Sequence, residues 1–157
     1  CALPIFWQLY KFFKREAILN LRESFQIDKS VEIMFPVTWL GNISIGSNSY
    51  IMSNCELVTG SNSKIVIGEN CAIARNVTIR TWSHKKGLKL HRTENTHELD
   101  IVIGNNCWLA TNCYIKEGVI LGDNCIVASN CVVTKSFDKG SIIAGVPGRL
   151  IGYNRVD

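Results

Sequence analysis

The sequence predicts an all-β protein in which short parallel strands stack into a β-helix of six-residue repeats. Three observations predict this fold. A large aliphatic residue recurs every six positions from Ile103 to Val127 without a shift in register. The fourth position of each unit is Asn or Gly, and the fifth is usually Cys or Val. A period of six fits neither an α-helix nor a simple alternating strand, so each unit must contain one short strand and one turn.

The spacing of the columns predicts which side chains face the core. The fifth column and the next first column are two residues apart, as in Cys107 and Leu109, and therefore point to the same, inward face of a strand. Asn and Gly tolerate positive φ, which places the fourth column at the turns. Three units would close a triangular coil of about 18 residues, and the roughly fourteen units in the chain predict about four to five coils.

Residues 1–30 precede the repeats and are predicted to form a helical segment. Aromatic and apolar residues recur at near-helical spacing over about residues 3–25, beside several basic residues. An open end of stacked strands needs a cover, so we expect this helix to cap the first coil or to pack on a partner subunit. The alternative is a peripheral contact between this basic amphipathic helix and the inner face of a membrane.

The repeats occupy residues 31–136 and are interrupted twice. Extra residues near Gly60 lengthen one turn, and the register stops at Ile79 and resumes at Ile103. We expect residues 80–100 to form a loop extruded from the stack, because a break in so regular a scaffold is a common place for function. Residues 137–157 leave the repeat as a C-terminal tail that is expected to cover the other end.

The cysteines follow the repeat. Six of the seven occupy the fifth column, where a narrow core requires a small apolar side chain: Cys55, Cys71, Cys107, Cys113, Cys125 and Cys131. A free cysteine behaves as a small hydrophobic residue. The paired Cys-x-x-Cys clusters typical of zinc sites are absent from the sequence. We therefore expect reduced core cysteines, no metal and a cytoplasmic protein.

Length and composition limit the class of protein. The 157 residues predict one domain, and no apolar run is long enough for a transmembrane helix. The N-terminus lacks an evident secretory signal. The net charge of +4 fits either an ordinary surface or attraction for an anionic ligand, and no basic stripe predicts binding to nucleic acid.

Three segments resemble the signatures of hexapeptide-repeat acetyltransferases and follow one another in the same order along the chain. This family includes the maltose, galactoside, serine and capsule or O-antigen acetyltransferases. These segments are residues 103–110, 133–135 and 144–149. The resemblance covers about residues 31–152. It implies that the β-helix is left-handed and parallel and that the protein is a homotrimer with active sites between subunits. Together with the N-terminal helix and the extruded loop predicted above, this gives a left-handed parallel β-helix of hexapeptide repeats. The resemblance also implies acetyl-CoA as the acyl donor.

The resemblance identifies His84, a few residues past an Asn-Val-Thr-Ile strand, as the general base. Acetyl transfer to a hydroxyl requires removal of its proton, which a histidine can accept near neutral pH. His91 and His97 are interpreted as solvated loop residues, with contact to substrate as the alternative. The basic run Lys85, Lys86, Lys89 and Arg92 is either a solvated face or a contact for phosphates or an acidic sugar. No carboxylate that orients His84 is identified from the sequence.

The resemblance also assigns residues to coenzyme A. It implies Trp108 as a wall of the acyl or acceptor site and a backbone N–H near Ala110, where the family usually has Gly, as a donor to the oxyanion. Thr111 and Ser129 would line the pantetheine arm. The remaining contacts implied toward the cofactor are Thr134, Lys135 and Arg149.

The expected reaction is O-acetylation of a sugar, in surface polysaccharide or lipopolysaccharide biosynthesis. The acceptor would be a nucleotide-linked sugar, a lipid-linked sugar or an oligosaccharide. Residues 52–54 replace the Asn-Phe-Asn stretch of the maltose and galactoside enzymes, which argues against those two acceptors. The alternatives are transfer to an amine or to serine, and a catalytically silent β-helix that serves in assembly. A γ-type carbonic anhydrase is disfavoured because all three histidines fall in one loop.

Overall fold

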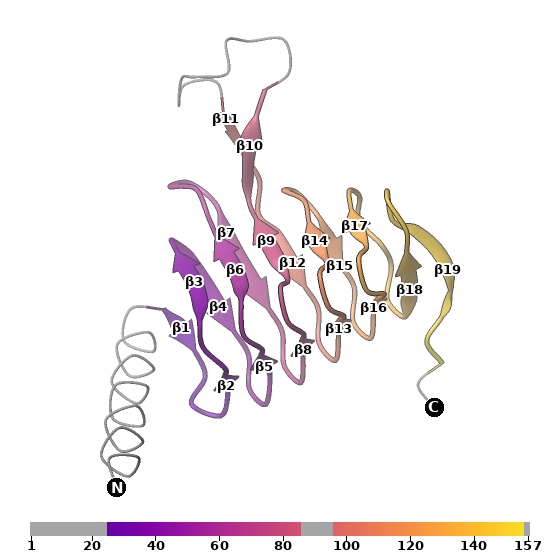
Figure 1. Cartoon of the computed structure of the whole chain (residues 1–157), viewed down its shortest axis with the longest axis horizontal. Helices are drawn as coiled ribbons and strands as arrows, with labels where there is room; N and C mark the ends of the chain where they lie inside the picture. Colours follow the sequence, from indigo (N-terminus) through magenta and orange to yellow (C-terminus); the bar gives the residue numbers. More distant parts are fainter. Residues whose placement is uncertain (1–24, 86–95, 156–157) are drawn as a thin grey trace, which may run out of the picture.

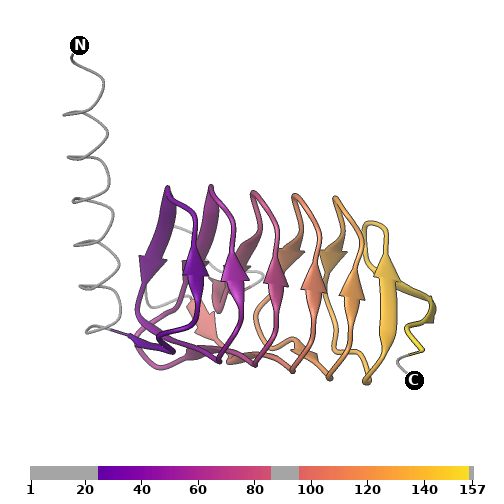
Figure 2. The ribbon, with the colours of Figure 1, turned by 90° about the horizontal axis from the view of Figure 1, so that it is seen from below.

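The structure, a computed structural model, describes residues 25–85 and 96–155. Within these ranges short strands stack along one axis, from the N-terminal coil to the C-terminal hairpin (Figures 1 and 2). The predicted helix over residues 3–25 lies outside the described residues, apart from its last position.

Three sheets form the sides of the stack, and we name them A, B and C in the order in which the chain enters them. Sheet A contains β1 (Gln26–Ile27), β4 (Asn42–Ile45), β7 (Lys64–Ile67), β12 (Ile101–Ile103) and β15 (Ile120–Leu121). Sheet B contains β2 (Glu32–Ile33), β5 (Tyr50–Ile51), β8 (Ala72–Ile73), β13 (Trp108–Leu109), β16 (Ile126–Val127), β18 (Ser141–Ala144) and β19 (Arg149–Tyr153). Sheet C contains β3 (Val37–Leu40), β6 (Cys55–Val58), β9 (Thr78–Arg80), β14 (Tyr114–Ile115) and β17 (Val132–Val133).

Strands that follow one another along the stack are parallel and keep the predicted register. Leu109 pairs with Val127 in sheet B, and Ile115 pairs with Val133 in sheet C. Each inward residue therefore lies above its equivalent in the coil before, which confirms the all-β fold of stacked parallel coils.

The core is a column of branched aliphatic side chains and cysteines. Ile73, Leu109 and Val127 are fully buried on sheet B. All six predicted core cysteines are buried and free. Five of the six thiols, all but that of Cys131, donate hydrogen bonds to backbone carbonyl groups, as in Cys113 Sγ to Ala110 O at 2.8 Å. A cysteine in this column can therefore be buried while its thiol remains hydrogen-bonded.

The turns use asparagine as the sequence predicts. Asn106, Asn112 and Asn130 have φ between 56° and 62°, and Gly118 has φ of 80°. The side-chain amides also stack from coil to coil: Asn76 Nδ2 donates to Asn112 Oδ1 at 2.9 Å, and Asn112 Nδ2 donates to Asn130 Oδ1 at 3.0 Å. This ladder holds the corner between sheets B and C in line.

The excursion leaves the corner between sheets C and A as an antiparallel ribbon. Strands β10 (Trp82–His84) and β11 (Thr96–Glu98) pair with each other and project away from the stack (Figure 1). Ser83 lies opposite His97, and His84 lies opposite Thr96. The stack resumes at β12, with Ile101 opposite Ile65. The extruded loop is therefore confirmed at its two ends, and residues 86–95 lie outside the described residues.

The C-terminal segment adds one more strand before it folds back. Strand β18 pairs in parallel with β16, so the ladder of sheet B continues through Ile143, which is buried. Strand β19 then reverses and pairs with β18 in an antiparallel arrangement. Sheet B therefore ends in this hairpin, with β19 as its outermost strand (Figure 2).

Candidate active site

The ribbon is attached to the stack by hydrogen bonds at its base. We call this cluster the root of the ribbon, and it consists of Gly60, Asn62, Ser63, Thr81 and Glu98. Thr81 is fully buried, and its Oγ1 atom lies 2.6 Å from Ser63 Oγ and accepts a hydrogen bond from Gly60 N at 3.0 Å. Glu98 Oε2 accepts hydrogen bonds from Asn62 N at 2.8 Å and from Ser63 Oγ at 3.2 Å. The extra residues near Gly60 therefore hold the two ends of the ribbon.

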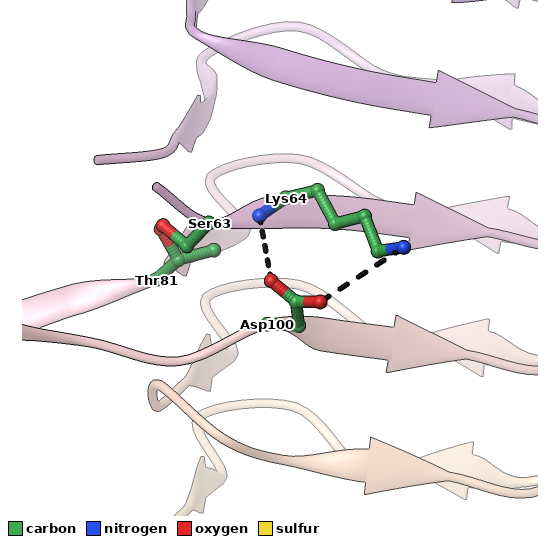
Figure 3. Close-up of polar contacts among 4 residues, drawn as sticks. All are labelled: Ser63, Lys64, Thr81 and Asp100. Atoms are coloured by element: carbon green, nitrogen blue, oxygen red, sulfur yellow. Dashed lines mark hydrogen bonds and ion pairs between the residues drawn. The ribbon is translucent and has the colours of Figure 1, made fainter. Parts of the chain in front are cut away.

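A second carboxylate supports the point at which the chain returns to the stack. Asp100 Oδ1 accepts a hydrogen bond from the backbone N–H of Lys64 at 2.9 Å, and Asp100 Oδ2 lies 4.0 Å from Lys64 Nζ (Figure 3). Ser63 and Thr81 lie beside this pair in the same view. Glu98 and Asp100, the first two carboxylates that follow His84 among the described residues, thus accept hydrogen bonds at the base of the ribbon.

His84 belongs to a row of side chains on one side of the ribbon. Alternate residues of a strand share a face, so Arg80, Trp82 and His84 project in the same direction. The rings of Trp82 and His84 meet edge to face with centroids 6.1 Å apart. The Arg80 guanidinium lies 5.3 Å from the centre of the Trp82 ring and forms an ion pair with Glu56 of the preceding coil. The exposed imidazole is supported by an ordered aromatic neighbour.

A cavity of about 340 Å³ opens beside this row and is lined by Gly60, Ser61, Trp82, Thr96 and Glu98. It lies between the turn that precedes β7 and the two strands of the ribbon. His84 adjoins it, because His84 packs on Trp82 and pairs with Thr96 across the ribbon. An aromatic face together with hydroxyl and carboxylate groups is the combination that orients a polyhydroxylated ligand.

The residues assigned to coenzyme A by resemblance lie mostly along another corner. Trp108 is on the outer face of sheet B and is 49% exposed. Ala110 and Thr111 follow it at the corner between sheets B and C, and Ser129 occupies the equivalent turn of the next coil. Asn130 N donates to Thr111 O at 2.9 Å, which stacks these two turns directly. Arg149 begins β19, after the last turn at this corner.

Thr134 and Lys135 lie at the corner between sheets C and A, after β17. The Lys135 ammonium lies 5.4 Å from the centre of the Phe137 ring. This is the corner from which the ribbon rises, further along the stack. Thr134 and Lys135 are thus separated by sheet C from the turns that contain Thr111 and Ser129.

One chain does not bring His84 and Trp108 together. His84 rises from the corner between sheets C and A, whereas Trp108 projects from sheet B, the side of the triangular stack opposite that corner. A site that uses both residues needs two chains.

The structure corrects the interpretation of His97. This histidine is a half-buried residue of β11, and its Nε2 atom lies 3.1 Å from Glu117 Oε1. The Glu117 side chain is only 1% exposed. Glu117 lies in a Lys-Glu-Gly turn, whose sequence gives no sign that the carboxylate turns inward. His91 lies outside the described residues.

Over residues 25–85 and 96–155, no helix is long and apolar enough to cross a bilayer. No three residues among the histidines, cysteines and acidic residues there gather as a metal site.

The comparisons with known proteins agree with the repeat architecture. Residues 100–135 match the family described as bacterial transferase hexapeptide (six repeats). Galactoside O-acetyltransferase of Escherichia coli (strain K12) is 33% identical over 110 residues, which cover 70% of this chain and 53% of that protein. The chain spans between 53% and 60% of the length of three such curated relatives.

Solved structures extend the match over nearly the whole chain. A maltose O-acetyltransferase from Clostridium difficile 630 superimposes with a TM-score of 0.78 and 27% identity, over 92% of this chain and 77% of that one. A galactoside acetyltransferase in complex with coenzyme A superimposes with a TM-score of 0.75 and 30% identity, over 92% of this chain and 72% of that one. With its stacked coils, extruded ribbon and these similarities, the chain belongs to the hexapeptide-repeat acetyltransferase family.

Proposed function

We propose that this protein transfers an acetyl group from acetyl-CoA to a hydroxyl of a sugar, with His84 as the general base. The observation that carries this proposal is the position of His84 on the ribbon, at the edge of the cavity lined by Trp82 and Glu98. Trp82 offers an apolar face to a sugar ring, and Glu98 and Ser61 offer polar groups to its hydroxyls. Relatives named as galactoside, maltose and polysialic acid O-acetyltransferases support a sugar acceptor.

The proposed reaction needs no covalent intermediate on the protein. His84 accepts the proton of the acceptor hydroxyl as its oxygen attacks the thioester carbon. A backbone N–H near Ala110 stabilises the oxyanion of the tetrahedral intermediate. The intermediate then expels the coenzyme A thiolate, and the His84 imidazolium returns a proton to that sulfur.

We propose that the protein is a homotrimer whose active sites lie between subunits. His84 of one chain would meet the row of Trp108, Thr111 and Ser129 of its neighbour, because one chain presents these groups on different sides. Arg149, Thr134 and Lys135 would contact the distal part of coenzyme A. Trp108, one of the large apolar side chains exposed on the described part of the stack, supports such an interface.

The proposed role is the acetylation of a surface polysaccharide or of one of its precursors, on the cytoplasmic side where acetyl-CoA is available. A similarity of 31% to a protein named as a colanic acid biosynthesis acetyltransferase, over 80% of this chain, supports this context.

The test is an acceptor screen. The purified protein is incubated with acetyl-CoA and a panel of nucleotide sugars, oligosaccharides, amino sugars and serine, and the release of free thiol is measured. We expect thiol release that depends on a sugar hydroxyl, with an O-acetyl ester as product. An amide product, or acetylation of serine alone, would contradict the proposal, as would failure to bind coenzyme A.

A further inference from the structure

A buried carboxylate joins the ribbon to the body of the β-helix from behind. Glu117 lies in the turn after β14, one coil beyond the root of the ribbon. Its Oε1 atom lies 3.1 Å from His97 Nε2 and forms an ion pair with Lys116 Nζ. Its Oε2 atom is buried and has no hydrogen-bond partner among the described residues.

This arrangement is not one that maximises stability. A carboxylate loses its hydration when it is buried, and an oxygen left without a hydrogen bond is not compensated. The side chain of Lys116 is 41% exposed, so the charge of Glu117 is matched only from the solvent side. Replacement of a buried ion pair by apolar residues is often neutral or stabilising. The carboxylate is therefore better explained by the group that it holds.

The geometry of the ribbon shows what Glu117 holds in place. His97 lies directly opposite Ser83, the residue before His84. Neighbouring residues of a strand point to opposite faces, so His97 points back toward the stack while His84 points to the Trp82 side. Leu99 follows His97 by two residues and lies close to Gly118. A Cβ atom added at Gly118 would lie 2.9 Å from Leu99 Cδ1. The back of the ribbon is thus seated on the Glu117–Gly118 turn.

We propose that Glu117 is a positioning residue for acetyl transfer and that it acts through its contact with His97. By fixing β11 from behind, it sets the position of His84 relative to the acceptor hydroxyl on the other face. The inference rests on the proposed function, because the role of His84 is proposed there. Positioning matters for catalysis because a displacement of about 1 Å can reduce the rate by about 100-fold.

The experiment compares variants that break the contact with variants that leave it intact. Glu117→Leu and His97→Leu remove the hydrogen bond, and Glu117→Gln retains an oxygen that can accept it. We expect kcat to fall by about 10- to 100-fold in the two leucine variants, with KM for acetyl-CoA changed less than about twofold. Glu117→Gln should stay within about threefold of the natural protein. If Glu117→Leu fails to fold, His97→Leu, a change on the half-buried ribbon, carries the test.

Val119→Ala is the matched control, because Val119 is buried in the same turn and its aliphatic side chain cannot form a hydrogen bond with His97. It loosens the turn by creating a small cavity and should leave kcat close to that of the natural protein. An equal fall of kcat in Val119→Ala would mean that general loosening, rather than the His97 contact, sets the rate. That result would overturn the inference.

Hydrogen exchange gives a readout that does not depend on turnover. The amides of Ser83 and His84 should exchange faster in Glu117→Leu and His97→Leu than in Val119→Ala, while the core strands are unchanged. If the natural protein acetylates no acceptor, the proposed function fails, yet the exchange data still test the anchor. Folded leucine variants with unchanged exchange and unchanged kcat would overturn the inference.

Discussion

The hydroxyl oxygens of Ser63 and Thr81 lie 2.6 Å apart in a buried contact between two successive coils, at the root of the ribbon. Thr81→Val keeps the shape of the side chain but removes the oxygen that also accepts the Gly60 N–H. We expect a loss of about 1–3 kcal/mol in the free energy of unfolding, because buried polar groups lose a partner. Urea unfolding measures the loss. Thr78→Val, on the outer face of the preceding strand β9, should change stability much less.

Gly60→Ala should damage the cavity beside His84. An added Cβ at Gly60 would lie 2.1 Å from the carboxyl carbon of Glu98, so Glu98 must move and release Asn62. We expect KM for the acceptor to rise by about tenfold, with KM for acetyl-CoA nearly unchanged, because only the acceptor pocket is displaced. Gly152→Ala is the control, since its nearest atom would lie 3.9 Å away. Equal effects on both substrates would argue against an acceptor site at this cavity.

His84→Ala tests the proposed base directly. Turnover should fall by about 10²- to 10⁴-fold, the range expected when general-base assistance is lost. The affinity for coenzyme A, measured by calorimetry, should stay nearly the same because His84 acts on the acceptor proton. A variant with unchanged turnover would remove His84 from the mechanism.

Mixed oligomers test whether active sites lie between chains. His84→Ala and Trp108→Ala should each lower activity when assembled alone. After unfolding and reassembly together at equal amounts, about one quarter of the sites should combine an intact His84 with an intact Trp108 from the neighbour. Recovery of activity toward that fraction supports the shared site. Absence of recovery in properly reassembled oligomers would contradict it.

The buried thiol of Cys113 predicts a loss of stability at alkaline pH. Burial raises the pKa of the Cys113 thiol to about 11 from its ordinary value of 9.0. Between these values the unfolded chain releases a proton that the folded chain retains, so the stabilisation is complete below pH 9 and is lost as the pH approaches 11. The expected loss is about 2–3 kcal/mol.

Urea midpoints between pH 8 and pH 11 measure this loss, and Cys113→Ala should flatten part of the slope. Burial also raises the pKa values of Cys55 and Cys131, so some slope should remain in the variant. Parallel curves for the variant and the natural protein would show that Cys113 does not contribute.

The regular part of the fold could be predicted because each coil repeats the same local chemistry. Cys113 must be small and apolar because its neighbours along the stack leave little room. Asn112 must adopt positive φ because the chain turns there. These requirements act within one six-residue unit, so they are visible in the sequence as a period.

The ribbon and its contacts could be predicted only in outline. A broken period shows where the chain leaves the stack, but the contact between Ser63 and Thr81 depends on how two irregular segments meet in space. The pair His97–Glu117 joins residues that follow no shared pattern, and the burial of Glu117 results from the ribbon lying over it. Pairings of this kind depend on tertiary packing rather than on local propensity.

Both irregular segments, the turn near Gly60 and the ribbon, leave the stack at the same corner, and the hydrogen-bonded ladder closes beneath them with Ile65 opposite Ile101. The length of the chain inserted between β9 and β12 therefore has no effect on the register of the later coils. Ribbons from related proteins should be transplantable onto this stack as units, provided that Thr81 and Asp100 are kept as the junctions. In evolutionary terms, acceptor range can diversify at this corner while selection on the remaining coils preserves folding and the proposed contacts to coenzyme A.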